Sequence, residues 1–192
     1  MDVYLISTLL VALAEMGDRT QILAVMLASR FRKPVPILLG IFAATIANHA
    51  LAAVAGYYLS SLLQATWFKY AVAVSFIAMA LWALIPDKED EADAKPRGHL
   101  GVFFTTLISF FIVEIGDKTQ IATVALAAKY HAILLVAAGT TTGMMIANIP
   151  AVYLGHNVTK VLPIKWLRIA AALVYLGLGL WGVATTAGWV KG

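Results

Sequence analysis

The sequence contains no cysteine and few charged residues. Of its 192 residues, 12% are charged and 61% are hydrophobic, and the mean hydropathy is +0.86. The absence of cysteine excludes disulfides, thiolate metal sites and cysteine nucleophiles. Because a soluble domain is about one quarter charged, the composition also excludes an ordinary soluble enzyme and a disordered chain. The net charge of +4 comes without a basic run long enough to bind nucleic acid. The composition therefore predicts an integral membrane protein.

Six apolar segments are each long enough to cross the bilayer as one helix, for which about 20 residues suffice. They are Val3–Leu27, Pro36–Leu63, Trp67–Ile85, Gly101–Ala128, Ile133–Val158 and Trp166–Ala187. Lipid favours helices because each backbone N–H and C=O must then be satisfied within its own segment. The segments predict an all-α integral membrane protein with six transmembrane helices.

A seven-residue motif occurs twice. Residues 15–21, Glu-Met-Gly-Asp-Arg-Thr-Gln, return as residues 114–120, Glu-Ile-Gly-Asp-Lys-Thr-Gln, 99 positions later. This repeat predicts two three-helix halves, 1–85 and 101–192, joined by an acidic linker, 86–100. Since three is an odd number of spans, the second half is expected to be inverted relative to the first. Inverted repeats are typical of secondary transporters that bind their substrate near the bilayer midplane.

The basic residues of the loops are distributed unequally between the two sides of the membrane. The linker side is expected to hold nine of them, and the opposite side three: Lys69, Lys129 and Lys191. Because basic loops stay in the cytoplasm, this bias predicts a protein of the cell (inner) membrane with a cytoplasmic linker and both termini outside.

Four acidic residues lie deep within the predicted spans. Each costs about 2.5–3.5 kcal/mol at the bilayer centre, so four cost on the order of 10 kcal/mol and are expected to serve a function. Their i, i+3 spacing predicts that both acids of a motif share one helix face, with a glutamine one step further. Such oxygen ligands suit a hard divalent cation. The predicted metal site consists of Glu15, Asp18, Glu114, Asp117, Gln21 and Gln120.

The charges of the two motifs suggest an exchange mechanism. The four carboxylates together with Arg19 and Lys118 leave a charge of −2, which one divalent cation or two protons neutralise. Cation and protons would therefore compete for one site. We expect a divalent-cation/proton antiporter and not an enzyme, without catalytic residues or a cofactor. Its expected partners are the cation, protons and the lipid bilayer, with no nucleic acid, and a homo-oligomer stays open.

The doubled motif Glu-x-Gly-Asp-(Lys/Arg)-(Thr/Ser) resembles that of the Golgi calcium/manganese transporter family. This family has a bacterial branch of manganese exporters and is similar in design to the cation/Ca²⁺ exchangers. The resemblance implies a six-span inverted-repeat carrier that moves Mn²⁺, or as second choice Ca²⁺, out of the cytosol in exchange for protons. It also implies that the four acids bind the ion and that Thr20 and Thr119 supply the motif hydroxyls. The two hydroxyls have an alternative role, a hydrogen bond back to their own helix.

Other polar or small residues within the spans allow two interpretations each. Asn48 and Asn148 occur at matching positions, and we favour a lining or ligand role over a purely structural bond between helices. Gly17 and Gly116 are either packing residues or points where the helix loosens to admit an ion. His49, which the second half does not repeat, is more readily a packed, hydrogen-bonded histidine than a proton relay.

Alternatives to the antiporter also follow from the motif. Glu15 with Arg19, and Glu114 with Lys118, have the i, i+4 spacing of structural ion pairs. The acids could instead engage the ammonium group of a small cationic solute or amino acid in an exporter of similar size. An intramembrane hydrolase and an inert scaffold are the remaining alternatives, and the symmetric duplication of costly acids argues against both.

Overall fold

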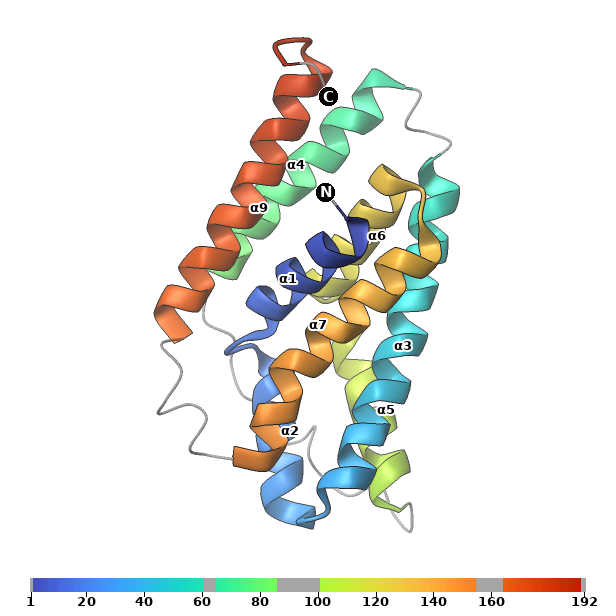
Figure 1. The fold of residues 1–192 in the computed structure, drawn as a ribbon, viewed down its shortest axis with the longest axis vertical. Coiled ribbons are helices and arrows are strands. Elements are labelled where there is room, and N and C mark those ends of the chain that lie inside the picture. The colour runs from blue at the N-terminus through green and yellow to red at the C-terminus, as the bar shows by residue number, and fades with distance from the viewer. Residues whose placement is uncertain (1, 61–64, 86–100, 155–163, 191–192) are drawn as a thin grey trace.

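A computed structural model describes residues 2–60, 65–85, 101–154 and 164–190 of the chain. All regular secondary structure within these ranges is helical, and the predicted linker, 86–100, lies outside them. The described helices are α1 (Val3–Glu15), α2 (Arg19–Phe31), α3 (Pro34–Leu59), α4 (Thr66–Ala83), α5 (Val102–Glu114), α6 (Lys118–Tyr130), α7 (Ile133–Leu154) and α9 (Ile164–Thr186) (Figure 1).

The two halves repeat each other in their backbone geometry. Helices α5 and α6 begin and end 99 positions after α1 and α2, with equal lengths. Gly17 and Gly116 have φ of 80° and 76°, and Arg32 and His131 close α2 and α6 at φ of 52° and 53°. The duplicated sequence therefore specifies a duplicated local structure, including its left-handed residues.

Each motif interrupts a helix, so the prediction of continuous first and fourth spans is wrong. Helix α1 ends at Glu15 and α2 begins after Asp18, which is extended at φ −82° and ψ 166°. The intervening Gly17 has the positive φ that only glycine adopts without steric cost. Glu15 and Asp18 consequently do not share a continuous helix face. The helix is interrupted at Gly17 and Gly116, in agreement with the second interpretation of these glycines, and that the interruption admits an ion stays a prediction.

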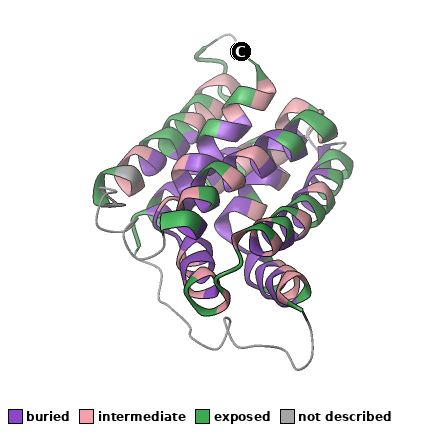
Figure 2. Cartoon of the chain, turned by 60° about the horizontal axis from the view of Figure 1, so that its bottom comes forward, coloured by how far each residue is buried: buried purple, intermediate pink, exposed green. Residues whose placement is uncertain are grey.

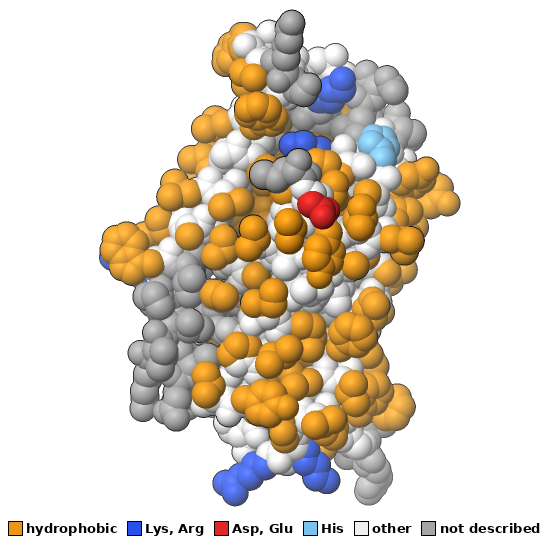
Figure 3. All heavy atoms as spheres, in the orientation of Figure 1, with side chains coloured by type: hydrophobic (Ala, Val, Ile, Leu, Met, Phe, Trp, Pro, Cys, Tyr) orange, Lys and Arg blue, Asp and Glu red, His pale blue; other side chains and the backbone are white. Residues whose placement is uncertain are grey.

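The exterior of the bundle is that of a membrane protein. Helices α3, α4 and α7, together with residues 168–186 of α9, are long and apolar enough to cross a membrane, and α1 and α5 are shorter apolar helices. Hydrophobic side chains cover most of the face seen in Figure 3, and Lys and Arg side chains gather at its two ends. The predicted all-helical membrane class is confirmed at this level.

Close helix crossings are also repeated in the two halves. A Cβ at Gly40 of α3 would lie 2.8 Å from the carbonyl oxygen of Phe103 in α5. A Cβ at Gly139 of α7 would lie 2.6 Å from the carbonyl oxygen of Tyr4 in α1. Since neither site has room for a side chain, α3 packs on α5 as α7 packs on α1, while α4 and α9 lie side by side (Figure 1).

The interior contains two hydrophobic clusters, and the motifs connect them. One cluster includes Ala14 of α1 and Ala122 of α6, and the other includes Leu23 of α2 and Val113 of α5. The chain therefore passes from the first cluster to the second through one motif and returns through the other. The buried residues of both clusters lie inside the bundle (Figure 2).

Candidate cation site

The glutamine of each motif braces the turn that interrupts the helix. The backbone N–H of Gly17 donates to Gln21 Oε1 at 2.8 Å, and that of Gly116 donates to Gln120 Oε1 at 2.7 Å. Gln21 Nε2 also donates to the carbonyl oxygen of Ala147 in α7 at 2.9 Å. These bonds explain why both copies need a glutamine here, and a role of the two side chains as metal ligands stays a prediction.

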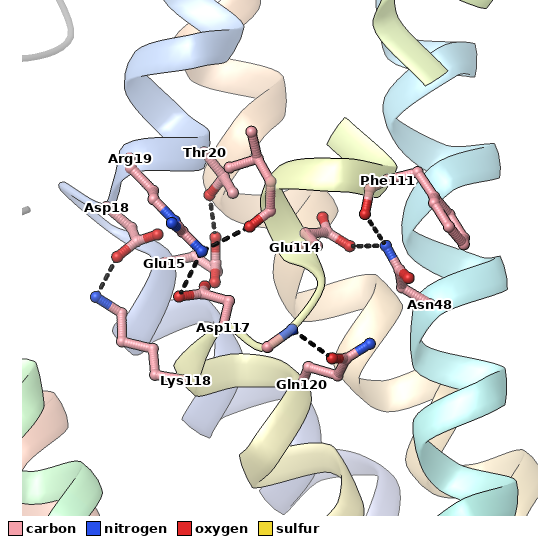
Figure 4. Close-up of polar contacts among 12 residues, drawn as sticks. Glu15, Asp18, Arg19, Thr20, Asn48, Phe111, Glu114, Asp117, Lys118 and Gln120 are labelled. Atoms are coloured by element: carbon pink, nitrogen blue, oxygen red, sulfur yellow. Dashed lines mark hydrogen bonds and ion pairs between the residues drawn. The ribbon is translucent and has the colours of Figure 1, made fainter. Parts of the chain in front are cut away.

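Three of the four motif acids meet where the helices are interrupted. Glu15, Asp18 and Asp117 each offer a carboxylate oxygen, and these atoms lie within 4.8 Å of one another. The three residues are only 0%, 1% and 2% exposed. Ca²⁺ binds oxygen at about 2.3–2.6 Å, so two of its ligands can be about 5 Å apart. The spacing and the shared origin from both motifs suit one divalent cation (Figure 4).

The basic residues form ion pairs between the motifs and not within them. Lys118 pairs with Asp18, and Arg19 pairs with Asp117 at 3.3 Å (Figure 4). Arg19 also donates to the carbonyl oxygen of Val113 at 2.6 Å. The within-motif pairing of Arg19 with Glu15 and of Lys118 with Glu114, considered from the sequence, is therefore not the arrangement seen among the described residues. Each half instead supplies a cation to an aspartate of the other half, which joins the two motifs.

Glu15 combines one bonded oxygen with one that has no hydrogen-bond partner. The Thr20 hydroxyl donates to Glu15 Oε2, so Thr20 serves a motif acid and not its own helix. Glu15 Oε1 is buried without a hydrogen-bond partner among the described residues, as are Thr119 Oγ1 and Asn148 Oδ1. Burying such an oxygen costs free energy unless a donor or a cation compensates it. Glu15 Oε1 is consequently well suited to bind an incoming cation.

Glu114, the fourth acid, is bonded by α3 instead. Thr45 Oγ1 and Asn48 Nδ2 donate to its two carboxylate oxygens at 3.1 Å and 3.2 Å. Asn48 Nδ2 also donates to the carbonyl oxygen of Phe111 at 3.1 Å, whereas Asn148 Nδ2, among the described residues, bonds to Met144 of its own helix alone. The structure thus brings Asn48 to a motif acid. Direct binding of the ion by Glu114 or by Asn148 stays a prediction.

Tyr175 of α9 is a candidate site residue that our sequence reasoning missed. It is 0% exposed, its ring stacks on Phe76 with centroids 6.4 Å apart, and its hydroxyl has no hydrogen-bond partner among the described residues. The hydroxyl interacts electrostatically with the carboxylates of Glu15, Asp18 and Asp117. Phe76 and Tyr175 are 99 positions apart and therefore occupy the same position in the two repeats. The second repeat has a tyrosine hydroxyl where the first has a phenylalanine, and this difference could have identified Tyr175 from the sequence.

Two further polar residues, His49 and Arg168, differ in their contacts. His49 is 1% exposed and neither ring nitrogen has a hydrogen-bond partner among the described residues, which argues against the hydrogen-bonded histidine expected from the sequence. Arg168 at the start of α9 donates to the carbonyl oxygen of Gly17 at 2.9 Å. A basic side chain of the α4–α9 pair therefore covers the first motif.

An all-helical apolar bundle with buried acids at two helix interruptions belongs to the class of ion-transporting membrane proteins. Comparison with known proteins agrees, because the family described as "Divalent cation/proton antiporter GDT1" matches residues 3–91 and 102–189. The chain belongs to the GDT1 family. The resemblance inferred from the doubled motif is thereby confirmed.

Curated relatives cover nearly the whole chain. A Vibrio cholerae protein named "Putative manganese exporter" is 47% identical over 182 residues, which are 94% of this chain and 90% of the relative. A GDT1-like protein of Synechocystis is 29% identical over 87% of this chain and 89% of its own length. A GDT1-like protein of Arabidopsis thaliana is 24% identical over 90% of this chain and 91% of its own length. No solved structure matches the chain.

Proposed function

We propose that this protein exports divalent cations, Mn²⁺ before Ca²⁺, from the cytosol in exchange for protons. The observation that carries the proposal is the meeting of Glu15, Asp18 and Asp117, whose ligand oxygens lie within 4.8 Å in the buried interior. The name of the Vibrio cholerae relative supports Mn²⁺ as the substrate. Atoms this close suit a single ion better than the ammonium group of an organic solute, the alternative substrate.

The charge of the site supports exchange with protons. Glu15, Asp18, Glu114 and Asp117 carry four negative charges when ionised, and Arg19 with Lys118 returns two positive charges. The remaining charge of −2 cannot persist in an apolar interior without compensation. One divalent cation or two protons compensate it equally, so the arrival of one favours the release of the other.

The ion pairs between the two motifs suggest how cation binding is coupled to a movement of the halves. Lys118 pairs with Asp18, and Arg19 pairs with Asp117. An incoming cation competes with these two side chains for the carboxylates, so its binding weakens contacts that join the motifs. We expect the halves to move relative to each other at this step and to expose the site to the opposite side of the membrane.

The topology of the proposed carrier is six spans in two inverted halves. Counting each interrupted pair, α1–α2 and α5–α6, as one span gives three spans on either side of the linker. The opposite order in which the two motifs connect the hydrophobic clusters supports the inversion. The excess of basic residues on the linker side supports a cytoplasmic linker and external termini in the inner membrane.

The test is transport by the purified chain in proteoliposomes with an imposed pH gradient. We expect Mn²⁺ uptake into vesicles with an acidic interior, accompanied by a rise of internal pH, with Ca²⁺ slower and Mg²⁺ slowest. Metal flux without proton movement and without dependence on pH would remove the exchange mechanism, and the absence of any metal flux would remove the transport proposal.

A matched pair of variants links the flux to the site. Asp18→Asn is expected to abolish uptake. Asp2→Asn makes the same change at the exposed N-cap of α1, where the side chain accepts a bond from the Tyr4 N–H, and is expected to leave uptake unchanged. Equal activity of the two variants would contradict the assignment of the site.

A further inference from the structure

A cavity of about 360 Å³ lies away from the motifs, at the end of the bundle where α9 ends. It is lined by the first turns of α4, the last turns of α9, and residues near the ends of α3 and α6. Lys69, Lys129 and His131 contribute polar groups, and no Asp or Glu occurs among its described lining residues. A cavity with two ammonium groups and no carboxylate repels a divalent cation, so the transported ion does not account for it.

The position of Lys69 requires a separate explanation. Lys129 lies in the last turn of α6, where a positive charge is favourable beside the free carbonyl groups, and its ammonium also lies 5.4 Å from the Tyr130 ring centroid. Lys69 instead lies at the start of α4, where the partial charge of the helix end is also positive. An anion between the two lysines would compensate both.

The lining changes from polar to apolar with depth. Lys69 and Phe76 are separated by seven residues of α4, about 10 Å along a helix. The inner wall consists of Ala73, Phe76 and Leu178, and the first two of these are only 2% exposed. A free inorganic anion gains nothing from an apolar inner wall, whereas an amphiphile with an anionic head matches both ends of the cavity.

The hydroxyls at the polar end narrow the chemistry of the head group. Thr185 and Thr186 donate to carbonyl oxygens of their own helix, at distances between 2.7 and 3.1 Å. Their oxygens are therefore left mainly as acceptors for donors of a ligand. This pattern suits a head group that carries free hydroxyls next to its phosphate.

We propose that this cavity, in the part of the chain that the structure describes, binds an anionic phospholipid with a hydroxyl-bearing head group, such as phosphatidylglycerol. The phosphate lies between Lys69 and Lys129, the head-group hydroxyls meet Thr185 and Thr186, and the glycerol end of the acyl chains rests on the wall that includes Phe76. The lipid would bridge the α4–α9 pair and the end of α6. The inference is independent of the transported ion.

The experiment is native mass spectrometry of the full chain released from nanodiscs that contain equal parts of phosphatidylglycerol and phosphatidylcholine. The unaltered chain is expected to retain phosphatidylglycerol preferentially. In the double variant Lys69→Gln/Lys129→Gln retention should weaken about 30-fold, from the usual contribution of two lysines near anionic lipid. The matched control, Lys33→Gln/Lys165→Gln, removes two exposed lysines at the starts of α3 and α9 and should retain the lipid.

Four outcomes would overturn the proposal. They are equal retention of the two lipids by the unaltered chain, equal loss in both double variants, undiminished retention in Lys69→Gln/Lys129→Gln, and displacement of the lipid by millimolar inorganic phosphate. The last would identify a site for free phosphate. If the double variant does not fold, the comparison of the two lipids on the unaltered chain still decides.

Discussion

The two motifs have the same backbone but different surroundings. Gly17 and Gly116 have the same left-handed conformation and each is braced by its glutamine. Yet Glu15 keeps one oxygen without a hydrogen-bond partner among the described residues, whereas both oxygens of Glu114 are bonded by α3. Arg168 covers the first motif by bonding to Gly17, but the residue that matches it in the repeat, Lys69, lines the cavity at the other end of the bundle.

This difference indicates that the two copies of the motif have the same sequence pattern and backbone but differ in how their glutamates are bonded. Nothing within the seven residues of a motif explains why one glutamate is bonded and the other is not. The α3 and α9 side chains around the motifs make the distinction. In the proposed carrier, the opposite conformation would exchange these roles between the halves, which is the simplest way for inverted repeats to provide alternating access.

The largest effect is expected from the two motif aspartates, and it should separate stability from transport. Asp18→Asn and Asp117→Asn should both reduce Mn²⁺ transport more than 100-fold. Asp18→Asn should also destabilise the fold by about 3–5 kcal/mol because it removes the buried carboxylate that pairs with the 4% exposed Lys118. Asp117→Asn should cost less, since Arg19 is 38% exposed and can be hydrated. Thermal unfolding in detergent, measured beside proteoliposome transport, tests both statements.

A double variant provides the control for this prediction. Asp18→Asn combined with Lys118→Met removes both charges of the buried pair and should recover most of the lost stability without recovering transport. Recovery of transport would show that Asp18 acts only as the partner of Lys118.

The next effect concerns the two basic residues. Lys118→Gln should lower the free energy of unfolding by about 3 kcal/mol, because the side chain of Lys118 is 4% exposed and its loss leaves Asp18 buried without its cation. Arg19→Gln should cost less, about 1–2 kcal/mol, because Arg19 is 38% exposed and contributes less to the pair, although Asp117 itself is 2% exposed. Thermal unfolding of the two variants checks the order, and equal destabilisation would contradict the asymmetry described above.

The asparagines of α3 and α7 should differ as well. Asn48→Ala removes donors from Glu114 and Phe111 and should cost about 1–3 kcal/mol, with slower transport. Asn148→Ala loses bonds only within its own helix and should cost under about 1 kcal/mol. Unfolding midpoints and initial transport rates for both variants decide this, and a larger effect of Asn148 would indicate that the observed asymmetry is not the resting arrangement.

A glycine pair separates backbone strain from function. Gly116→Ala and Gly188→Ala both introduce a Cβ at φ +76° with nothing within 4 Å, so each should cost about 1 kcal/mol. Only Gly116 lies in a motif, and only its variant should slow transport. Similar transport by both variants would mean that the geometry of the second turn is not needed for ion movement.

The smallest change in stability is expected at the aromatic pair. Tyr175→Phe keeps the stack on Phe76 and removes a buried hydroxyl that has no hydrogen-bond partner among the described residues, so stability should be nearly unchanged or slightly higher. Transport should fall several-fold if the hydroxyl assists the cation. The matched control, Tyr153→Phe on an exposed tyrosine, should transport normally. Unchanged Mn²⁺ affinity and rate in Tyr175→Phe would remove Tyr175 from the site.

Sequence reasoning identified the helical membrane class and predicted the candidate acids, three of which the structure brings together, but it misjudged the local geometry around them. The length of the apolar segments was sufficient to predict the membrane class, and the doubled motif was sufficient to select the acids, because both are properties of the chain itself. The same apolar run led to a continuous helix through Glu15 and Asp18, although Gly17 allows a left-handed turn. The pairing of Lys118 with Asp18, and the bonds from Asn48 to Glu114, join residues distant in the chain and could not be read from i, i+4 spacing.

The sequence alone determined that buried carboxylates must be present in an apolar bundle, and that they come in two sets with equal numbers of basic partners. This could be predicted because charge and hydropathy are properties of each residue type and do not depend on tertiary contacts. Tertiary structure alone decided which acids meet and which are already bonded, and it buried the Tyr175 hydroxyl in the interior. Packing between helices brings Glu15, Asp18 and Asp117 together and places donors of α3 beside Glu114, and the free energy of a buried charge depends on such distances.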